Sequence, residues 1–159
     1  MRAYVNSGKY LADTDNEIDY SSNGIYSNLP SELQSVIIDT YVVSGYGSKD
    51  SANFTTIDKI YLFSPHEIWN DVDGNTSSGI DYYDKSYNNT RQLDYNAGLN
   101  VTTSNYSMAI KKRTGTNYSW WLRSSSANTH DIYLVNANGS PYPSISSDAR
   151  GVSPAFRLG

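Results

Sequence analysis

WWLRS at residues 120–124 and GVSPAFRL at residues 151–158 are two apolar stretches near the carboxyl end, and they give the strongest indication of the fold. Their aromatic and aliphatic residues are typical of buried strands. Between them lies a run of small and polar residues, 125–150. Two core-forming stretches that flank a segment of small and polar residues are typical of a scaffold that presents a recognition surface. The contrast therefore favours binding over catalysis.

The composition of the chain excludes several classes of protein. Its 159 residues fit one domain with a core of its own, and the absence of cysteine excludes disulfides, a thiol nucleophile and a cysteine metal site. A net charge of -4 argues against nucleic-acid binding, which needs a basic surface. The basic run Lys111 to Arg113 is interpreted as a solvated loop. No segment is apolar for long enough to insert into a membrane.

Local signals predict a mixed α+β architecture. Pro30 opens a helix, a strand follows at residues 40–44, and a second strand at 57–63 runs into a helix start. Ser64, Pro65 and Glu67 form the pattern of a capping box at that start. A further helix is expected from Thr90 to Ala97, ended by Gly98.

The terminal region, residues 120–158, is expected to be built from β-hairpins. Residues 131–136 alternate as a strand, Asn138-Gly139 predicts a two-residue turn, and residues 151–158 form a last strand. Pro154 within that strand implies an edge position or a bulge. We expect a single domain over 1–159, with two helices packed on a curved, mostly antiparallel sheet. Its N-terminal segment, residues 1–28, is polar, turn-rich and poorly defined.

The combination of DKIYLFS at residues 58–64 with the two terminal stretches resembles a bacterial domain family of unassigned function. The likeness covers about residues 29–158. It implies a C-type lectin-like fold, related to that of formylglycine-generating enzymes. Ser153 departs from the pattern, since the family more usually carries arginine there.

The layout is also similar to that of the variable proteins of diversity-generating retroelements. In those proteins, exposed positions of a C-terminal lectin-like segment are rewritten by adenine-directed mutagenesis. Asparagine codons ending in C that are altered at adenines never yield Lys, Glu, Gln, Met or Trp. Residues 124–150 contain none of these five amino acids, which is consistent with such a history. The resemblance therefore implies a hypervariable face over residues 124–150.

The candidate ligand-binding residues are the polar and aromatic side chains of that segment, which can stack on a partner and form varied hydrogen bonds. Asp131 and Tyr133 share one strand face, as do Ser144 and Ser146. The full candidate set comprises Ser126, Asn128, His130, Asp131, Tyr133, Asn136, Asn138, Tyr142, Ser144, Ser146 and Asp148. The alternative is a solvated β-surface without a partner.

The aromatic residues of the two flanking stretches have two interpretations. Trp120, Trp121 and Phe156 are expected to pack in the core, and a carbohydrate platform is the less favoured alternative. Arg123 and Arg157 are expected to be structural, spanning carboxylates or carbonyl groups beside that core.

Metal and catalytic sites have weaker signals. Asp71, Asp73 and Asn75 form a weak calcium candidate, for which a turn without metal is the favoured interpretation. His66 is expected at the surface, and neither His66 nor His130 belongs to a recognisable triad motif. We therefore expect no metal, no cofactor and no enzymatic activity.

The sequence favours a recognition module for a protein or glycan partner, with no nucleic acid and no membrane insertion. We expect it on a bacterial cell surface, in a secreted protein or on a phage particle, as part of a longer chain. The alternatives are a structural or spacer domain without a diversified site and an enzyme related to formylglycine-generating oxidases. Those oxidases need paired cysteines, which this chain lacks.

Overall fold

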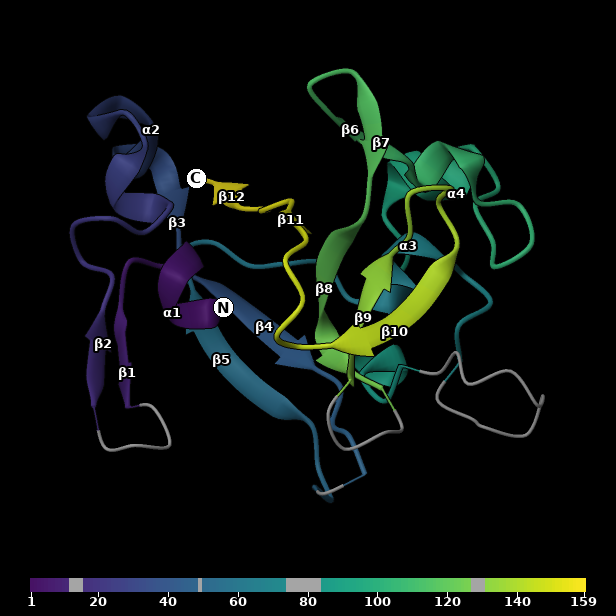
Figure 1. Cartoon of the computed structure of the whole chain (residues 1–159), viewed down its shortest axis with the longest axis horizontal. Coiled ribbons are helices and arrows are strands. Elements are labelled where there is room, and N and C mark those ends of the chain that lie inside the picture. Colours follow the sequence, from purple (N-terminus) through teal and green to yellow (C-terminus); the bar gives the residue numbers. More distant parts are fainter. Residues whose placement is uncertain (12–15, 49, 74–83, 127–130) are drawn as a thin grey trace. The chain divides into compact units, whose positions relative to one another are not determined.

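The computed structural model describes residues 1–11, 16–48, 50–73, 84–126 and 131–159. Within these ranges the protein is a mixed α+β structure with four short α-helices and several small sheets (Figure 1). Its contacts divide it into two compact units. Unit 1 comprises residues 1–42, 56–61 and 154–159, and unit 2 comprises residues 43–55 and 62–153. The two units are interleaved in sequence.

Unit 1 gathers short elements from both ends of the chain. Its buried apolar side chains include Val5, Ile37 and Ile60. Residues 1–28, for which only turns were expected, contain two short strands and two helical turns. The elements wholly inside unit 1 are α1 (Arg2–Val5), β1 (Lys9–Leu11), β2 (Glu17–Asp19), η1 (Tyr26–Asn28), α2 (Ser31–Val36), β3 (Ile37–Ile38) and β12 (Arg157–Leu158).

Two paired strands contain unit boundaries, because β4 (Thr40–Ser44) and β5 (Phe54–Asp58) each begin in one unit and end in the other. The strand β4 has the expected bounds. The strand expected at 57–63 instead ends at Asp58, and Tyr61 forms an isolated bridge with Ala155.

Unit 2 holds the main sheet, in the strand order β10-β9-β8-β11. Its neighbouring strands are antiparallel, except that β11 runs parallel to β8. The elements wholly inside unit 2 are α3 (Pro65–Ile68), η2 (Tyr87–Asn89), α4 (Asp94–Gly98), η3 (Ser107–Ala109), β6 (Lys111–Arg113), β7 (Thr116–Tyr118), β8 (Trp120–Ser125), β9 (Asp131–Val135), β10 (Pro141–Ile145) and β11 (Gly151–Val152).

Two helix signals are confirmed in unit 2. Helix α3 begins at Pro65 with both hydrogen bonds of the capping box between Ser64 and Glu67. Helix α4 ends at Gly98 but begins later than expected, at Asp94. The basic run at 111–113, expected as a loop, is the exposed strand β6 paired with β7.

The core of unit 2 is built on the WWLRS strand. Trp120 and Leu122 pack in one buried cluster with Trp69, Tyr133 and other apolar side chains. Trp121 is also buried, at 2% exposure, so the core interpretation of both tryptophans is confirmed. It is wrong for Phe156, which is 37% exposed.

The terminal strand expected at 151–158 is two strands. Residues 151–152 pair with β8, whereas residues 157–158 pair with β3. Pro154 lies between them, because a residue without an amide hydrogen cannot continue a ladder. The apolar pattern of residues 151–158 therefore covers two short strands that pair with different partners.

The β9–β10 turn has three residues where two were expected. Asn136 donates its amide to the Ser140 carbonyl, and Gly139 donates to the Asn136 carbonyl. Gly139 has φ of +96°, a left-handed conformation that glycine adopts without strain. The signal for a turn was right and its length was wrong, since the extra residue makes a bulge.

Candidate functional site

The predicted binding residues of segment 124–150 fall into four groups by exposure. Exposed members are Asn138, Tyr142 and Ser146, and half-buried members are Asp131, Asn136 and Asp148. Buried members are Ser126, Tyr133 and Ser144. Asn128 and His130 lie outside the described residues.

The expectation that Tyr133 faces a ligand is wrong. Its side chain is 0% exposed and belongs to the core cluster with Trp120 and Val135. The strand alternation was correct, but the face that holds Tyr133 is the one that packs on the core. Strand β9 lies between β8 and β10, and Tyr133, Leu134 and Val135 are all buried. The middle of β9 therefore has no open face.

Ser126 and Ser144 are also misplaced by the surface prediction, since they are 2% and 8% exposed. The Ser126 amide donates to the Asp131 carbonyl at 3.0 Å, across the β8–β9 connection. The Ser144 hydroxyl donates to Asp148 Oδ2 at 2.6 Å, and Arg150 Nη2 donates to the same oxygen at 2.9 Å. These polar groups stabilise the chain's own turns.

The two asparagines of the hairpin use their side chains locally. Asn136 Oδ1 accepts from the Ala137 amide at 2.8 Å and from the Ser119 hydroxyl at 3.2 Å. Asn138 Oδ1 accepts from the amide and the hydroxyl of Ser140. Asparagine in such turns commonly bonds to nearby backbone, so these residues shape the hairpin.

What remains open is a surface along the edge strand β10, which we call the β10 surface and define by Tyr142, Ile145 and Ser146. Tyr142 is 49% exposed and Ile145 is 51% exposed. They lie on opposite faces of the sheet, because their positions differ by an odd number, and so they flank the edge from both sides. The candidate set of polar and aromatic residues does not include Ile145, although a large exposed apolar side chain on an edge strand is the stronger indicator of a binding surface.

The backbone of β10 is a poor template for further strand pairing. Asn136 and Ser140 form a hydrogen-bonded pair, and alternation along the ladder makes 134/142 and 132/144 the next such pairs. The backbone groups of residues 141, 143 and 145 therefore point away from β9. Pro141 and Pro143 occupy two of these positions and offer no amide hydrogen. Recognition at this edge is therefore expected to depend mainly on side chains.

A buried ion pair stabilises the C-terminal half of the WWLRS strand, β8. Arg123 binds both carboxylate oxygens of Glu67, at 2.6 and 3.1 Å. It also donates to the carbonyl groups of Val43 and Leu62, at 2.8 and 2.7 Å. Its side chain is 8% exposed. The expected structural role of Arg123 is confirmed, and the exposed Arg157 has no such burial.

A buried carboxylate that no local sequence pattern indicates lies next to this pair. Asp84 is 0% exposed, and its Oδ1 accepts from the amide and hydroxyl of Ser86 and from the Ser124 hydroxyl. Its Oδ2 accepts from the His66 amide at the start of α3. A Cβ on Gly45 would come within 2.7 Å of this carboxylate, so glycine is required there. Because its oxygens accept hydrogen bonds from several segments, this carboxylate has a structural role and connects those segments.

His66 is half-buried and therefore less exposed than expected. Its Nδ1 lies 3.0 Å from the Thr90 hydroxyl, and its ring packs on Tyr87. Burial lowers the pKa of His66 below its ordinary value, and the opposing influence of Asp84 is smaller. The neutral ring is thus the favoured form in the folded protein.

The calcium candidate uses its oxygens within the protein. Asp71 Oδ1 accepts from the Thr103 amide at 2.8 Å, and its Oδ2 accepts from the Thr103 hydroxyl at 2.6 Å. The Asp73 carbonyl accepts from the Asp84 amide, and Asn75 lies outside the described residues. Among the described residues, no three acidic, histidine or cysteine side chains form a group that could hold a metal ion.

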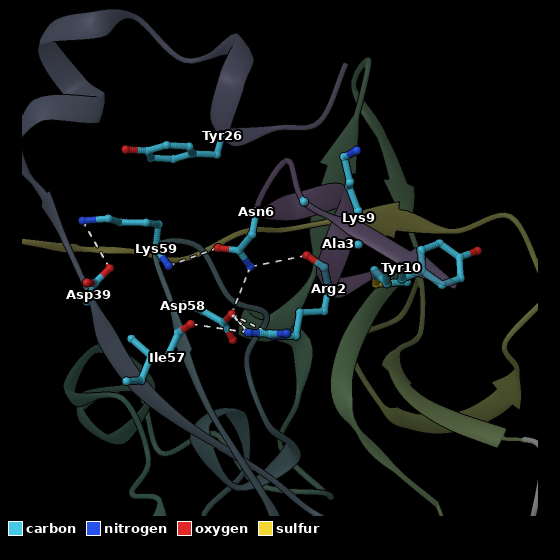
Figure 2. A pocket seen from close by; sticks show the side chains of 12 residues that line it. Arg2, Ala3, Asn6, Lys9, Tyr10, Tyr26, Asp39, Ile57, Asp58 and Lys59 are labelled. Atoms are coloured by element: carbon cyan, nitrogen blue, oxygen red, sulfur yellow. Dashed lines mark hydrogen bonds and ion pairs between the residues drawn. The ribbon is translucent and has the colours of Figure 1, made fainter. Parts of the chain in front are cut away.

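Unit 1 contains a pocket of about 530 Å³, lined by residues of α1, β1 and the segment around β5 (Figure 2). Arg2 donates to the buried Asp58 at 2.8 Å, and Lys59 Nζ lies 3.2 Å from Asp39 Oδ1. Asn6 ties α1 to this segment, since its side chain accepts from the amides of Lys59 and Ile60. None of these residues was a candidate, because their approach depends on contacts between segments that lie 20 to 56 positions apart in the sequence.

Unit 2 contains a smaller pocket of about 360 Å³ with a mainly apolar lining. Phe63 and Trp120 form part of its wall, and Tyr95 and Met108 are well exposed. Burial lowers the pKa of Lys111, whose Nζ lies 5.0 Å from the Trp120 ring centroid. The pocket adjoins the core cluster.

Comparison with known proteins identifies the family. The whole chain, residues 1–159, matches the family model described as Domain of unknown function (DUF6273), and the chain belongs to this family. No curated protein and no solved structure matches it significantly. In the part of the chain that the structure describes, no helix is long and apolar enough to cross a membrane. The function must therefore be inferred from the side chains.

Proposed function

We propose that the chain is a recognition module with a C-type lectin-like fold that binds a protein or glycan partner through the β10 surface. The observation that carries the proposal is the pair of large side chains, Tyr142 and Ile145, about half exposed on an edge strand in which prolines occupy two of the three outward backbone positions. Tyrosine is frequent among the residues that dominate binding energy. We propose no catalytic role for these side chains.

The chemistry of this surface favours a protein partner over a glycan. Ile145 offers only apolar area, which aliphatic or aromatic side chains cover better than sugar hydroxyls do. Tyr142 adds a ring and a hydroxyl group for hydrogen bonding. Strand addition is disfavoured because Pro141 and Pro143 remove outward amide donors. Affinity would therefore come from side-chain packing.

The wider setting belongs to the same proposal. The antiparallel β8–β9–β10 arrangement, with the WWLRS strand in the sheet interior, is compatible with a lectin-like terminal region. We propose that the module acts at a bacterial cell surface, in a secreted protein or on a phage particle. We also propose that a retroelement diversifies the exposed positions of segment 124–150. The variable residues would then be exposed ones such as Tyr142 and Ser146.

Partner selection on arrays of surface proteins and glycans, followed by biolayer interferometry, tests the proposal. The double variant Tyr142→Ala/Ile145→Ser should lose at least about tenfold in affinity for the selected partner, since two anchors are removed. Its melting temperature should stay close to that of the wild type because both side chains are half exposed.

The matched control is Tyr95→Ala, which removes a 69% exposed tyrosine from α4 in the same unit. This variant should bind as the wild type does. If the folded double variant retains full affinity, the β10 surface is not the site. A chain that selects no partner on either array would favour the spacer alternative.

A further inference from the structure

We propose that the pocket of unit 1 is a second binding site, which takes a neutral polyhydroxylated ligand of the saccharide class. The site lies in a different unit from the β10 surface and shares no residue with it. Its volume of about 530 Å³ falls within the range of about 300–1,000 Å³ that is usual for small-molecule sites.

The floor of the pocket is rigid and already satisfied. Asp58 is 5% exposed and accepts from Arg2 Nε at 2.8 Å and from the Thr56 hydroxyl at 2.6 Å. The side chain of Asn6 donates to the Ile60 carbonyl at 2.7 Å and accepts from two amides. Polar side chains held in this way keep their positions without a ligand.

The rim supplies both hydrogen-bond donors and acceptors. Asp39 is 64% exposed, and its Oδ1 lies 3.2 Å from the ammonium group of Lys59. Arg2 is 62% exposed although it is anchored to Asp58. A sugar hydroxyl can donate to a carboxylate and accept from a cation at the same time, so a pair such as Asp39 and Lys59 matches adjacent hydroxyl groups.

The charges of the pocket disfavour an anionic ligand. Arg2 pairs with Asp58, Lys59 with Asp39, and Lys9 with two carboxylates at 2.9 and 3.1 Å. Each lining lysine and arginine already has a carboxylate partner, which weakens its attraction for an anionic ligand. A neutral ligand does not have to compete with these carboxylates for the cations.

An aromatic side chain completes the site. Tyr10 lines the pocket, is 43% exposed, and stacks on Tyr20 with ring centroids 6.4 Å apart and planes 13° apart. Tyr20 in turn meets Tyr4 edge to face at 5.3 Å. Figure 2 shows Tyr10 on the same side of the pocket as Lys9. A tyrosine braced from behind offers a flat apolar face on which the C–H face of a sugar ring can pack.

Titration of the full chain by calorimetry and by amide NMR tests this inference. The neutral probes are the methyl glycosides of glucose, galactose, mannose and N-acetylglucosamine. The anionic probes are inorganic phosphate and methyl glucuronide. At least one neutral probe should bind more tightly than either anion and shift the amide signals of residues 2–10 and 57–59.

Variants locate the bound probe. Tyr10→Ala and Asp39→Ala should each weaken the binding of that glycoside by about five- to tenfold, an effect typical of one lost stacking or charged contact. Tyr41→Ala is the matched control, since Tyr41 is 78% exposed in the same unit and does not line the pocket. It should leave the affinity unchanged.

Three outcomes would overturn the inference: binding of no neutral glycoside, tighter binding of an anion, or full affinity in folded Tyr10→Ala and Asp39→Ala variants. None of them bears on the β10 surface, because Tyr142 and Ile145 are unchanged throughout these experiments.

Discussion

At the scale of single residues, two tyrosines of the terminal region show how position in the sheet determines role. Tyr133 and Tyr142 both occupy strands of the polar segment. Tyr133 lies on the central strand β9 and is fully buried, whereas Tyr142 lies on the edge strand β10 and is 49% exposed. The first is a core residue and the second is a proposed contact residue.

This contrast predicts very different stability effects. Tyr133→Ala should lower the free energy of unfolding by about 3–5 kcal/mol, because it removes a large buried ring and leaves a cavity. Tyr142→Ala should lower it by no more than about 1 kcal/mol. Urea denaturation followed by tryptophan fluorescence measures both. Equal losses in the two variants would contradict the assigned burial.

At the scale of elements, β10 combines an open edge with protection against self-association. Its outward backbone positions include Pro141 and Pro143, and its ladder partner is β9 alone among the described strands. Edge strands that keep all their amides can pair with another chain. The prolines thus keep the β10 surface available to side-chain recognition.

Replacing the two prolines should allow β10 to pair with a strand of another chain. The double variant Pro141→Thr/Pro143→Thr restores two outward amides and favours extended backbone, so its association should rise with concentration above that of the wild type. Sedimentation velocity over a range of concentrations measures it. Pro154→Thr is the control, since Pro154 lies between β11 and β12. A folded double variant that associates no more than the wild type would show that the prolines are not protective.

At the scale of the whole molecule, the two proposed sites are made by residues of different units. The pocket is lined by residues of unit 1, and the β10 surface belongs to unit 2. Each site can therefore be altered by substitutions within one unit. The retroelement hypothesis concerns only the second site.

Sequencing of this locus across many cells or phage genomes should reveal where variation is tolerated. Substitutions should gather at open positions such as Tyr142 and Ser146 and should spare Ser126, Tyr133 and Ser144. Replacement of a buried side chain can cost several kcal/mol, a large fraction of the stability of a typical domain. An even spread of substitutions over the chain would contradict diversification and would favour a spacer domain.

The features that depend on near neighbours in the chain can be predicted from the amino-acid sequence alone. The capping box of Ser64 and Glu67, the strand at 40–44, the turn at Gly139 and the buried tryptophans at 120 and 121 all follow from local chemistry or apolar runs. Hydrogen bonds within a few residues and the burial of large apolar groups need no knowledge of distant segments.

Which face of each strand is open, and which distant residues meet, is visible only in the folded structure. The alternation of a strand defines two faces but does not show whether neighbouring segments cover both of them. For this reason Tyr133 was wrongly predicted to be exposed, and Ile145 was not predicted as a binding residue. The pocket of unit 1 brings Arg2 to Asp58 across 56 positions. Similarly, Asp84 meets Ser124 across 40 positions. Such contacts arise because packing of the whole chain selects them, and no local pattern encodes them.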